Sequence, residues 1–154
     1  MNASRGVNVV QMQQRVAARL GDCGVFVIRA ASLAVTPAPV EHLRGGAVAS
    51  AGDAELVYAI VRDDGPASSR LFIDMQHTVT PAAARGRGLA GVLTLAAFRW
   101  AREAGVSGVL PSCTYTAGFL ARSRGAAAPG ALVAVGEELH LRVPVPPSER
   151  WSFE

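Results

Sequence analysis

The sequence predicts a single α/β domain. Its 154 residues, half of them hydrophobic, are enough for one packed core and too few for two ordinary domains. Segments that alternate with the strand period come first along the chain, and two segments with helical spacing follow, with a short apolar run between them. This order of strand, helix, strand and helix is typical of α/β proteins.

The first half of the body predicts an antiparallel meander of three strands joined by turns rich in Gly, Asp and Pro. We expect a short strand from Ala47, a turn at 51–53, a strand from Glu55 to Val61, a turn at 63–66 and a strand from Leu71 to Thr80. Pro81 cannot donate a hydrogen bond to a neighbouring strand, so the chain must leave the sheet there.

The second half predicts two helices separated by a short buried strand. Apolar residues from Leu89 to Trp100 recur at helical spacing, and Gly105 stands where a helix C-terminal cap is expected. A strand then covers Val106 to Leu110, and Ser112 offers an N-cap for a helix from Cys113 to about Arg122. A hairpin over 132–143, with Gly136 in its turn, precedes a proline-rich end.

Composition and charge argue against several functional classes. Residues 41–154 contain eleven Arg and eleven acidic residues, and this balance disfavours nucleic-acid binding, which needs clustered cations. The longest uncharged apolar run, 88–98, is far shorter than a bilayer-spanning helix. Two cysteines, 23 and 113, show no metal-ligand spacing, so neither a disulfide framework nor a metal site is expected.

Residues 1–40 form an N-terminal extension in this interpretation, and they hold the whole excess of positive charge. This segment contains four Arg and a single Asp. Between Val9 and Leu20 the spacing predicts a helix with one apolar face and another face that carries Arg. This acid-poor pattern is typical of an organellar transit peptide, but a helix that packs on the domain has the same pattern. The protein is therefore expected to be intracellular, either cytoplasmic or in a chloroplast or mitochondrion.

A glycine-rich turn, 85–91, opens directly into the first predicted helix. The first amides of a helix lack intrahelical partners, the helix dipole attracts anions there, and glycine leaves the backbone open to a phosphate. Gly86, Gly88 and Gly91 satisfy the GxGxxG spacing of dinucleotide-binding folds, but five residues, 81–85, separate the strand from the first of these glycines, and the ribose-binding acid is missing. No Lys-Ser/Thr pair follows, so a nucleoside triphosphate loop is excluded as well.

The residues Arg85-x-x-Gly88-x-Ala90 resemble the [QR]-x-x-G-x-[GA] motif of the GNAT superfamily of acetyl-coenzyme A dependent N-acetyltransferases. A His77-Thr78 block upstream and a Pro111-Ser112-Cys113-x-Tyr115 block downstream are similar to its compact single-domain subgroup. The resemblance covers roughly residues 42–124. It implies a mixed, mostly antiparallel sheet with flanking helices, in a catalytic domain over 41–125 with a C-terminal extension over 126–154.

The resemblance also implies how acetyl-coenzyme A (acetyl-CoA) binds. The strand that ends near Thr80 and the strand before Pro111 would splay apart and admit the pantetheine arm. Backbone amides would hold the diphosphate, which gives as expected cofactor-binding residues Val79, Arg85, Gly86, Arg87, Gly88, Leu89 and Ala90. No metal is implied.

Acetyl transfer to an amine needs a base, a site for the developing oxyanion and a proton for the departing thiolate. His77 is the candidate base, because an imidazole exchanges protons near neutral pH. Cys113, at a helix start, could donate a proton or accept the acyl group, and Tyr115 is a second candidate proton donor. Each also fits a structural role: backbone bonding for His77 and core packing for Cys113 and Tyr115. Where many family members have Tyr, this chain has Phe119.

The sequence therefore predicts an N-acetyltransferase whose acceptor is a primary amine, either on a protein (a lysine or an N-terminus) or on a small molecule. Two alternatives remain open. One is a non-catalytic CoA-binding module, which the Phe119 departure supports. The other is an interaction protein whose proline-rich tail, 144–147 with Trp151 and Phe153, docks a partner. The sequence leaves the oligomeric state open.

Overall fold

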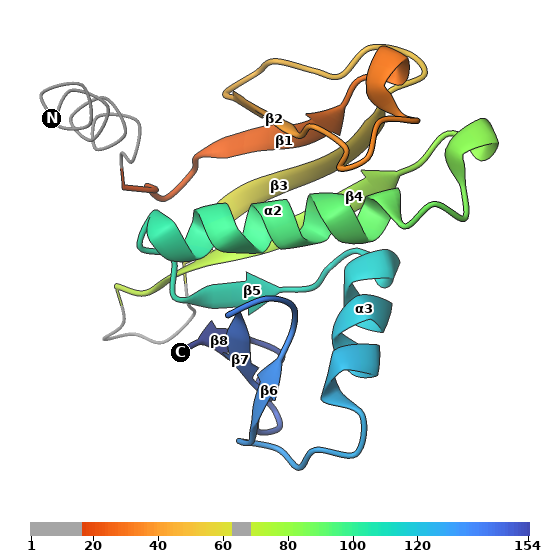
Figure 1. The fold of residues 1–154 in the computed structure, drawn as a ribbon. Coiled ribbons are helices and arrows are strands. Elements are labelled where there is room, and N and C mark those ends of the chain that lie inside the picture. The colour runs from red at the N-terminus through yellow and green to blue at the C-terminus, as the bar shows by residue number, and fades with distance from the viewer. Residues whose placement is uncertain (1–16, 63–68) are drawn as a thin grey trace, which may run out of the picture.

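A computed structural model describes residues 17–62 and 69–154 of the chain. In this part of the chain, eight strands form one sheet in the order β2-β1-β3-β4-β5-β8-β7-β6 (Figure 1). The strands are β1 (Cys23–Ile28), β2 (Glu41–Arg44), β3 (Ala54–Arg62), β4 (Leu71–Val79), β5 (Gly108–Leu110), β6 (Leu132–Ala134), β7 (His140–Arg142) and β8 (Trp151–Phe153). Two α-helices, α2 (Leu89–Glu103) and α3 (Thr114–Arg124), flank the sheet together with short 3-10 turns at Ala30–Ser32 and Ala82–Ala84.

The sheet is mixed and mostly antiparallel, since β4 and β5 run parallel and every other neighbouring pair is antiparallel. The α/β fold class predicted from the sequence is therefore confirmed. Parallel neighbours need a crossover connection, and α2 supplies it between β4 and β5. No helix in the described ranges is long and apolar enough to cross a membrane.

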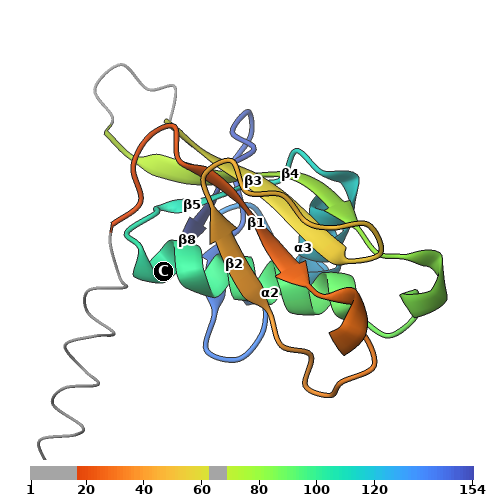
Figure 2. The same cartoon turned by 90° about the horizontal axis from the view of Figure 1, so that it is seen from above.

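Helix α2 covers one face of β1, β3 and β4 (Figure 2). Its buried side chains recur at helical spacing, as the sequence predicted, and include Leu93, Ala97 and Phe98. On β3 every second residue from Ala54 to Ile60 is buried, which is the pattern of a strand packed on one face. The helix ends at Glu103, and Gly105 follows with φ of +85°, the left-handed conformation expected at a glycine cap.

Two sequence-based expectations about strands and caps are wrong. Residues 47–50 form no strand; the strand of this region is β2, which ends at Arg44 where Gly45 turns the chain with φ of +75° and donates its amide to the Cys23 carbonyl. The N-cap of α3 is Cys113 rather than Ser112, because the Cys113 carbonyl accepts the first bond of the helix, from the Ala117 amide. The predicted turn at 63–66 lies outside the described residues.

The sheet includes strands from outside the range 41–125 that was expected for the catalytic domain. Strand β1 precedes the first limit and lies between β2 and β3, while β6 to β8 follow the second limit and extend the sheet beyond β5. A leader that spans 1–40 would therefore include an interior strand. The amphipathic pattern between Val9 and Leu20 falls mostly outside the described residues. The hairpin predicted over 132–143 is formed by β6 and β7.

An aromatic cluster lies between the sheet and the C-terminal half of α2. The His42 ring stacks on Phe26 with centroids 4.2 Å apart, meets Trp100 edge-on at 4.6 Å, and its Nε2 lies 2.6 Å from the Tyr58 hydroxyl. Burial, with a smaller contribution from the charge of Arg44, lowers the pKa of His42 from 6.5 to about 4. Burial likewise raises the pKa of Tyr58 to about 12. Both rings are therefore neutral in the fold near neutral pH.

The shifted pKa of His42 predicts a loss of stability in mild acid. The unfolded chain protonates His42 below pH 6.5, whereas the folded chain does so only near pH 4, so the contribution is complete above pH 6.5 and declines as the pH falls toward 4. Because the ring is partly exposed, we expect a loss on the order of 1 kcal/mol between pH 7.5 and pH 5. Urea unfolding at both pH values measures it. His42→Asn should remove this part of the pH dependence, and the exposed control His140→Asn should retain it; equal pH dependence in both would contradict the assignment.

Candidate active site

Strands β4 and β5 pair over only three residues and then diverge. Phe72 to Asp74 align with Gly108 to Leu110, and one more backbone bond, from the Cys113 amide to the Met75 carbonyl at 2.7 Å, closes the contact. Beyond it β4 continues to Val79 while the chain from β5 turns into α3. The last residues of β4 therefore have an edge that faces no strand, as the resemblance implied.

A bulge in β4 accompanies this divergence. Val57 of β3 pairs with His77 and Tyr58 pairs with Met75, so Gln76 has no partner of its own on β3. An extra residue of this kind bends a strand and reverses which face its later side chains occupy. As a result Thr78 lies on the α2 side of the sheet, opposite the buried Leu56, although Met75 also points to that side.

The turn between β4 and α2 presents unpaired amides to the same place. Gly86 and Gly88 have φ of +87° and +73°, and a Cβ built on either would meet nothing within 4 Å. The first amide with an intrahelical partner is that of Val92, which bonds to the Gly88 carbonyl. In the described part of the chain, the amides of 86–91 make no backbone hydrogen bond, and no side chain caps the helix. This end of α2 is therefore equipped to bind an anion.

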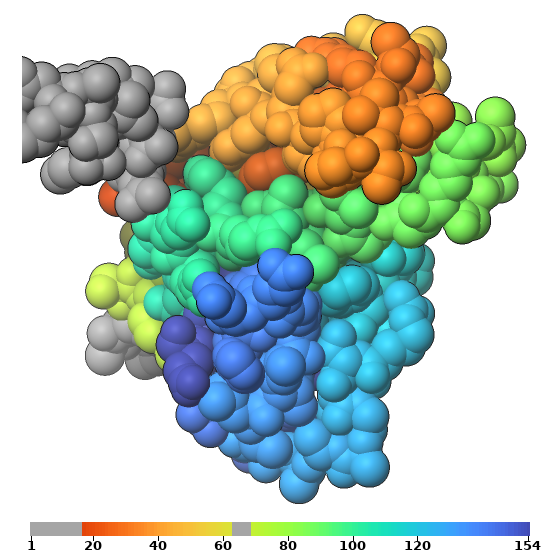
Figure 3. Space-filling view, viewed as in Figure 1, coloured from red at the N-terminus to blue at the C-terminus, as the bar shows by residue number. Residues whose placement is uncertain are grey.

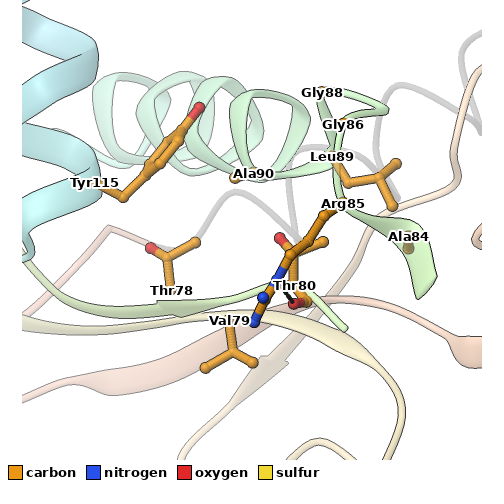
Figure 4. Close-up of a pocket in the computed structure, with 10 residues that line it drawn as sticks. All are labelled: Thr78, Val79, Thr80, Ala84, Arg85, Gly86, Gly88, Leu89, Ala90 and Tyr115. Carbon is orange, nitrogen blue, oxygen red and sulfur yellow. Dashed lines mark hydrogen bonds between the residues drawn. The ribbon is translucent and has the colours of Figure 1, made fainter. Parts of the chain in front are cut away.

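These features border one cavity of about 440 Å³ (Figure 4). The end of β4 forms its floor, the turn and the start of α2 form one wall, and Tyr115 of α3 closes another side. Arg85 reaches back across the cavity and its Nε donates to the Thr80 carbonyl at 3.3 Å. The lining residues are Thr78, Val79, Thr80, Ala84, Arg85, Gly86, Gly88, Leu89, Ala90 and Tyr115.

The cavity brings together most of the residues expected to bind the cofactor. Arg87 is the exception. It lines a neighbouring groove of about 620 Å³ between the segment 33–38 and the start of α2, which shares only Leu89 with the first cavity. In the space-filling view the segment 33–38 lies in the orange region, beside the green start of α2 (Figure 3).

Tyr115 is the only one of the three candidate catalytic residues that lines the cavity itself. Its hydroxyl lies 3.5 Å from where a Cβ on Gly91 would be, beside the first turn of α2. Phe119, one turn further along α3, packs edge-on against Phe98 of α2 with ring centroids 6.1 Å apart. The position at which the resemblance implied a Tyr therefore carries Phe119 in a contact between the two helices.

Cys113 lies behind the cavity, where its Sγ is 3.5 Å from the Thr78 hydroxyl. Burial raises the pKa of this thiol, but hydrogen bonds to the thiolate from the Thr78 hydroxyl, from the amides of Thr116 and Tyr115, and from the Thr116 hydroxyl outweigh burial and lower it. The Thr116 hydroxyl is fully buried and makes no hydrogen bond among the described residues while Cys113 is a thiol, so it is available to donate to the sulfur once the thiol ionises. The start of α3 thus stabilises a thiolate at Cys113.

His77 is exposed and lies outside the lining of this cavity. It pairs with Val57, and because neighbouring residues of a strand point to opposite faces, its side chain lies on the face away from α2. Val79, two residues on, also points away from the cavity side that Thr78 occupies (Figure 4). A proton acceptor at His77 would therefore act on a group that approaches the diverging strands from the face opposite α2.

Sequence reasoning missed Thr78 and Thr116 as functional candidates. Thr78 belongs to the His77-Thr78 block, and a hydroxyl next to the candidate base could have been singled out from the sequence. Nothing in the sequence links it to Thr116, because the two are brought to the same sulfur, that of Cys113, only by the packing of α3 beside β4. No group of three or more His, Cys, Asp or Glu side chains that could hold a metal ion occurs within 17–62 and 69–154.

Comparison with known proteins identifies the family. The family model described as GCN5-related N-acetyl-transferase matches residues 47–128, slightly more than half of the chain. The chain belongs to this family of acyltransferases, as the motifs around Arg85 and Cys113 predicted. No curated protein and no solved structure matches the chain.

The environment of Cys113 predicts a thiol that ionises below the ordinary cysteine range. In a Cys23→Ser background, where Cys113 is the only cysteine, the rate of alkylation by iodoacetamide against pH should report this ionisation. Thr78→Val removes one stabilising hydroxyl and should move the midpoint to higher pH. Thr114→Val, an exposed position on the same helix, is the matched control. An unchanged midpoint in Thr78→Val would show that this hydroxyl does not stabilise the thiolate.

Proposed function

We propose that this protein transfers an acetyl group from acetyl-CoA to a primary amine. The observation that carries this proposal is the placement of unpaired amides at the start of α2 next to the unpaired end of β4. The diphosphate of acetyl-CoA can bind to the unpaired amides, and the amide groups of its pantetheine arm can pair with the end of β4. When bound, it supplies an acyl group activated as a thioester.

The chain's own groups suit such a ligand from one end of the cavity to the other. The amides of 86–91 and the dipole of α2 favour a diphosphate, and Gly86 and Gly88 keep side chains away from it. The free edge of β4 near Thr78 offers backbone groups that can pair with amides. The Arg85 guanidinium lies along the same wall and adds positive charge.

The reacting groups would meet where β4 and β5 separate. An ammonium acceptor must lose a proton before it attacks, and His77 on the face opposite α2 takes that proton directly or through water. The leaving thiolate needs a proton, and Cys113 can donate one because its own thiolate is stabilised by the hydroxyls of Thr78 and Thr116. Tyr115 is the other donor within the cavity. We favour a single direct step; transient acetylation of the Cys113 sulfur is the competing route.

Gly88→Glu should abolish the binding of CoA. The new carboxylate would stand where the diphosphate is expected, and its charge would repel it. Isothermal titration with CoA measures the loss. Gly105→Glu is the control, since it adds the same charge and the same backbone strain at the opposite end of α2, with φ of +85° and open space around it. Undiminished affinity in Gly88→Glu would place the diphosphate elsewhere.

Substitution of the acid and base should lower turnover without abolishing CoA binding. We expect His77→Ala and Cys113→Ala each to lower kcat by about 100-fold, the usual contribution of general acid–base catalysis. Release of free CoA thiol with a panel of amines and peptides measures turnover. Intact mass after incubation with acetyl-CoA alone tests the competing route, because a stable acetyl group on Cys113 would contradict direct transfer. Unchanged turnover in both variants would contradict these roles and favour a non-catalytic CoA-binding module or other catalytic residues.

A further inference from the structure

A second cavity, of about 390 Å³, lies on the other side of α3 from the cofactor cavity. Tyr115 faces the cofactor cavity, whereas Ala117 and Ala121 of the same helix line this one. Pro111 and Ser112, which connect β5 to Cys113, also line it. The two cavities therefore flank the start of α3, which carries Cys113 and Tyr115, the two candidate proton donors of the proposed acetyl transfer.

The walls of this second cavity combine apolar and polar surface. Three prolines and Trp151 contribute to them, and the two alanines of α3 leave room beside the helix. Segments far apart in the sequence meet here: the exit of β5, one face of α3, and the tail between β7 and β8. A volume of this size suits a small molecule.

Two opposite charges line this second cavity, Arg124 at the end of α3 and Glu149 in the segment between β7 and β8. The ion pairs of the described residues include neither of them. Nε of Arg124 donates to the Ala127 carbonyl at 2.8 Å, which anchors the guanidinium, while its terminal nitrogens make no hydrogen bond in the described part of the chain. A ligand that carries both an anion and a cation would complement both side chains at once.

We propose that this second cavity, named the acceptor cavity from here on, binds a free α-amino acid with an apolar side chain as the amine that is acetylated. Arg124 would hold the carboxylate through its two terminal nitrogens, and Glu149 would attract the ammonium. Pro111, Pro144 and Trp151 would contact the apolar side chain. A lysine on a protein surface has no neighbouring carboxylate and would leave Arg124 without a role. This inference rests on the proposed acetyl transfer and specifies its acceptor.

The reaction is balanced by protons alone. A bond forms between the amine nitrogen and the acetyl carbon, and the bond between that carbon and the CoA sulfur breaks. The ammonium loses two protons; one ends on the sulfur of CoA and the other is released to solvent. No oxidant or further reactant is needed.

Three ligands of nearly the same shape separate the contributions of the two charges. L-leucine carries both, 3-methylbutylamine carries only the ammonium, and 4-methylpentanoate carries only the carboxylate. Titrations of the full chain in the presence of CoA, followed by NMR, should show L-leucine binding at least about tenfold more tightly than either of the others. Equal affinity for L-leucine and 3-methylbutylamine would overturn the proposal.

Two variants assign each charge to its partner. Arg124→Gln should weaken the binding of L-leucine and of 4-methylpentanoate at least about tenfold and leave the affinity for 3-methylbutylamine unchanged. Glu149→Gln should weaken the binding of 3-methylbutylamine and leave the affinity for 4-methylpentanoate unchanged. Arg99→Gln and Glu103→Gln, exposed on α2, are the matched controls and should change nothing. An Arg124→Gln variant that binds L-leucine as well as the unmodified chain would contradict the assignment.

Different experimental results would contradict the proposed function and the proposed acceptor. If CoA does not bind, acetyl transfer itself is wrong, whatever the amino acid does. If CoA binds and a lysine peptide is acetylated while L-leucine is neither bound nor acetylated, acetyl transfer stands and the amino-acid acceptor is wrong. If L-leucine is acetylated with a KM that rises at least about tenfold in Arg124→Gln, both are supported.

Discussion

The arrangement of the site depends on one constraint, which is that the amides at the start of α2 have no hydrogen-bond partner among the residues that the structure describes. Left-handed backbone at Gly86 and Gly88 turns the chain from β4 into the helix without a side chain in the way, and in the described ranges no side chain bonds to the amides of the first turn. Buried amides that go unpaired are costly, whereas amides at an open turn can be satisfied by water or by an anion. The fold thus keeps a positive helix end accessible beside the end of β4, and the other parts of the site lie around it.

One backbone hydrogen bond holds Cys113, the candidate acid, beside the cofactor cavity. The bond from the Cys113 amide to the Met75 carbonyl is the last backbone hydrogen bond between β4 and the chain that leaves β5. It fixes the start of α3 next to Thr78, so that the sulfur receives hydroxyls from β4 and from α3 and amides from the first helical turn. The divergence of the strands and the environment of the thiol therefore have the same origin. The bulge at Gln76 adds to it by placing Thr78 on the α2 side and His77 on the opposite side.

The sequence predicted those parts of the fold and the site that are encoded locally. Strands β3 and β4, helix α2 and the glycine turn follow from alternation, helical spacing and residue type within a few positions, and the structure has them close to where they were expected. Strand β1 was not predicted, because Val25 to Ile28 are all buried and its sequence therefore does not alternate. Its place between β2 and β3 is set by long-range pairing. The role of Thr116 and the separate position of Arg87 could not be predicted either, since both depend on how distant segments pack.

The most direct test of the central claim follows the backbone amides of 86–91 by NMR during titration with CoA and, separately, with pantetheine, which lacks the diphosphate. If these amides bind the diphosphate, CoA shifts the resonances of Gly86 and Gly88 strongly while pantetheine leaves them in place and shifts only residues at the end of β4. Equal shifts with both ligands, or shifts that CoA produces only elsewhere in the chain, would contradict the account.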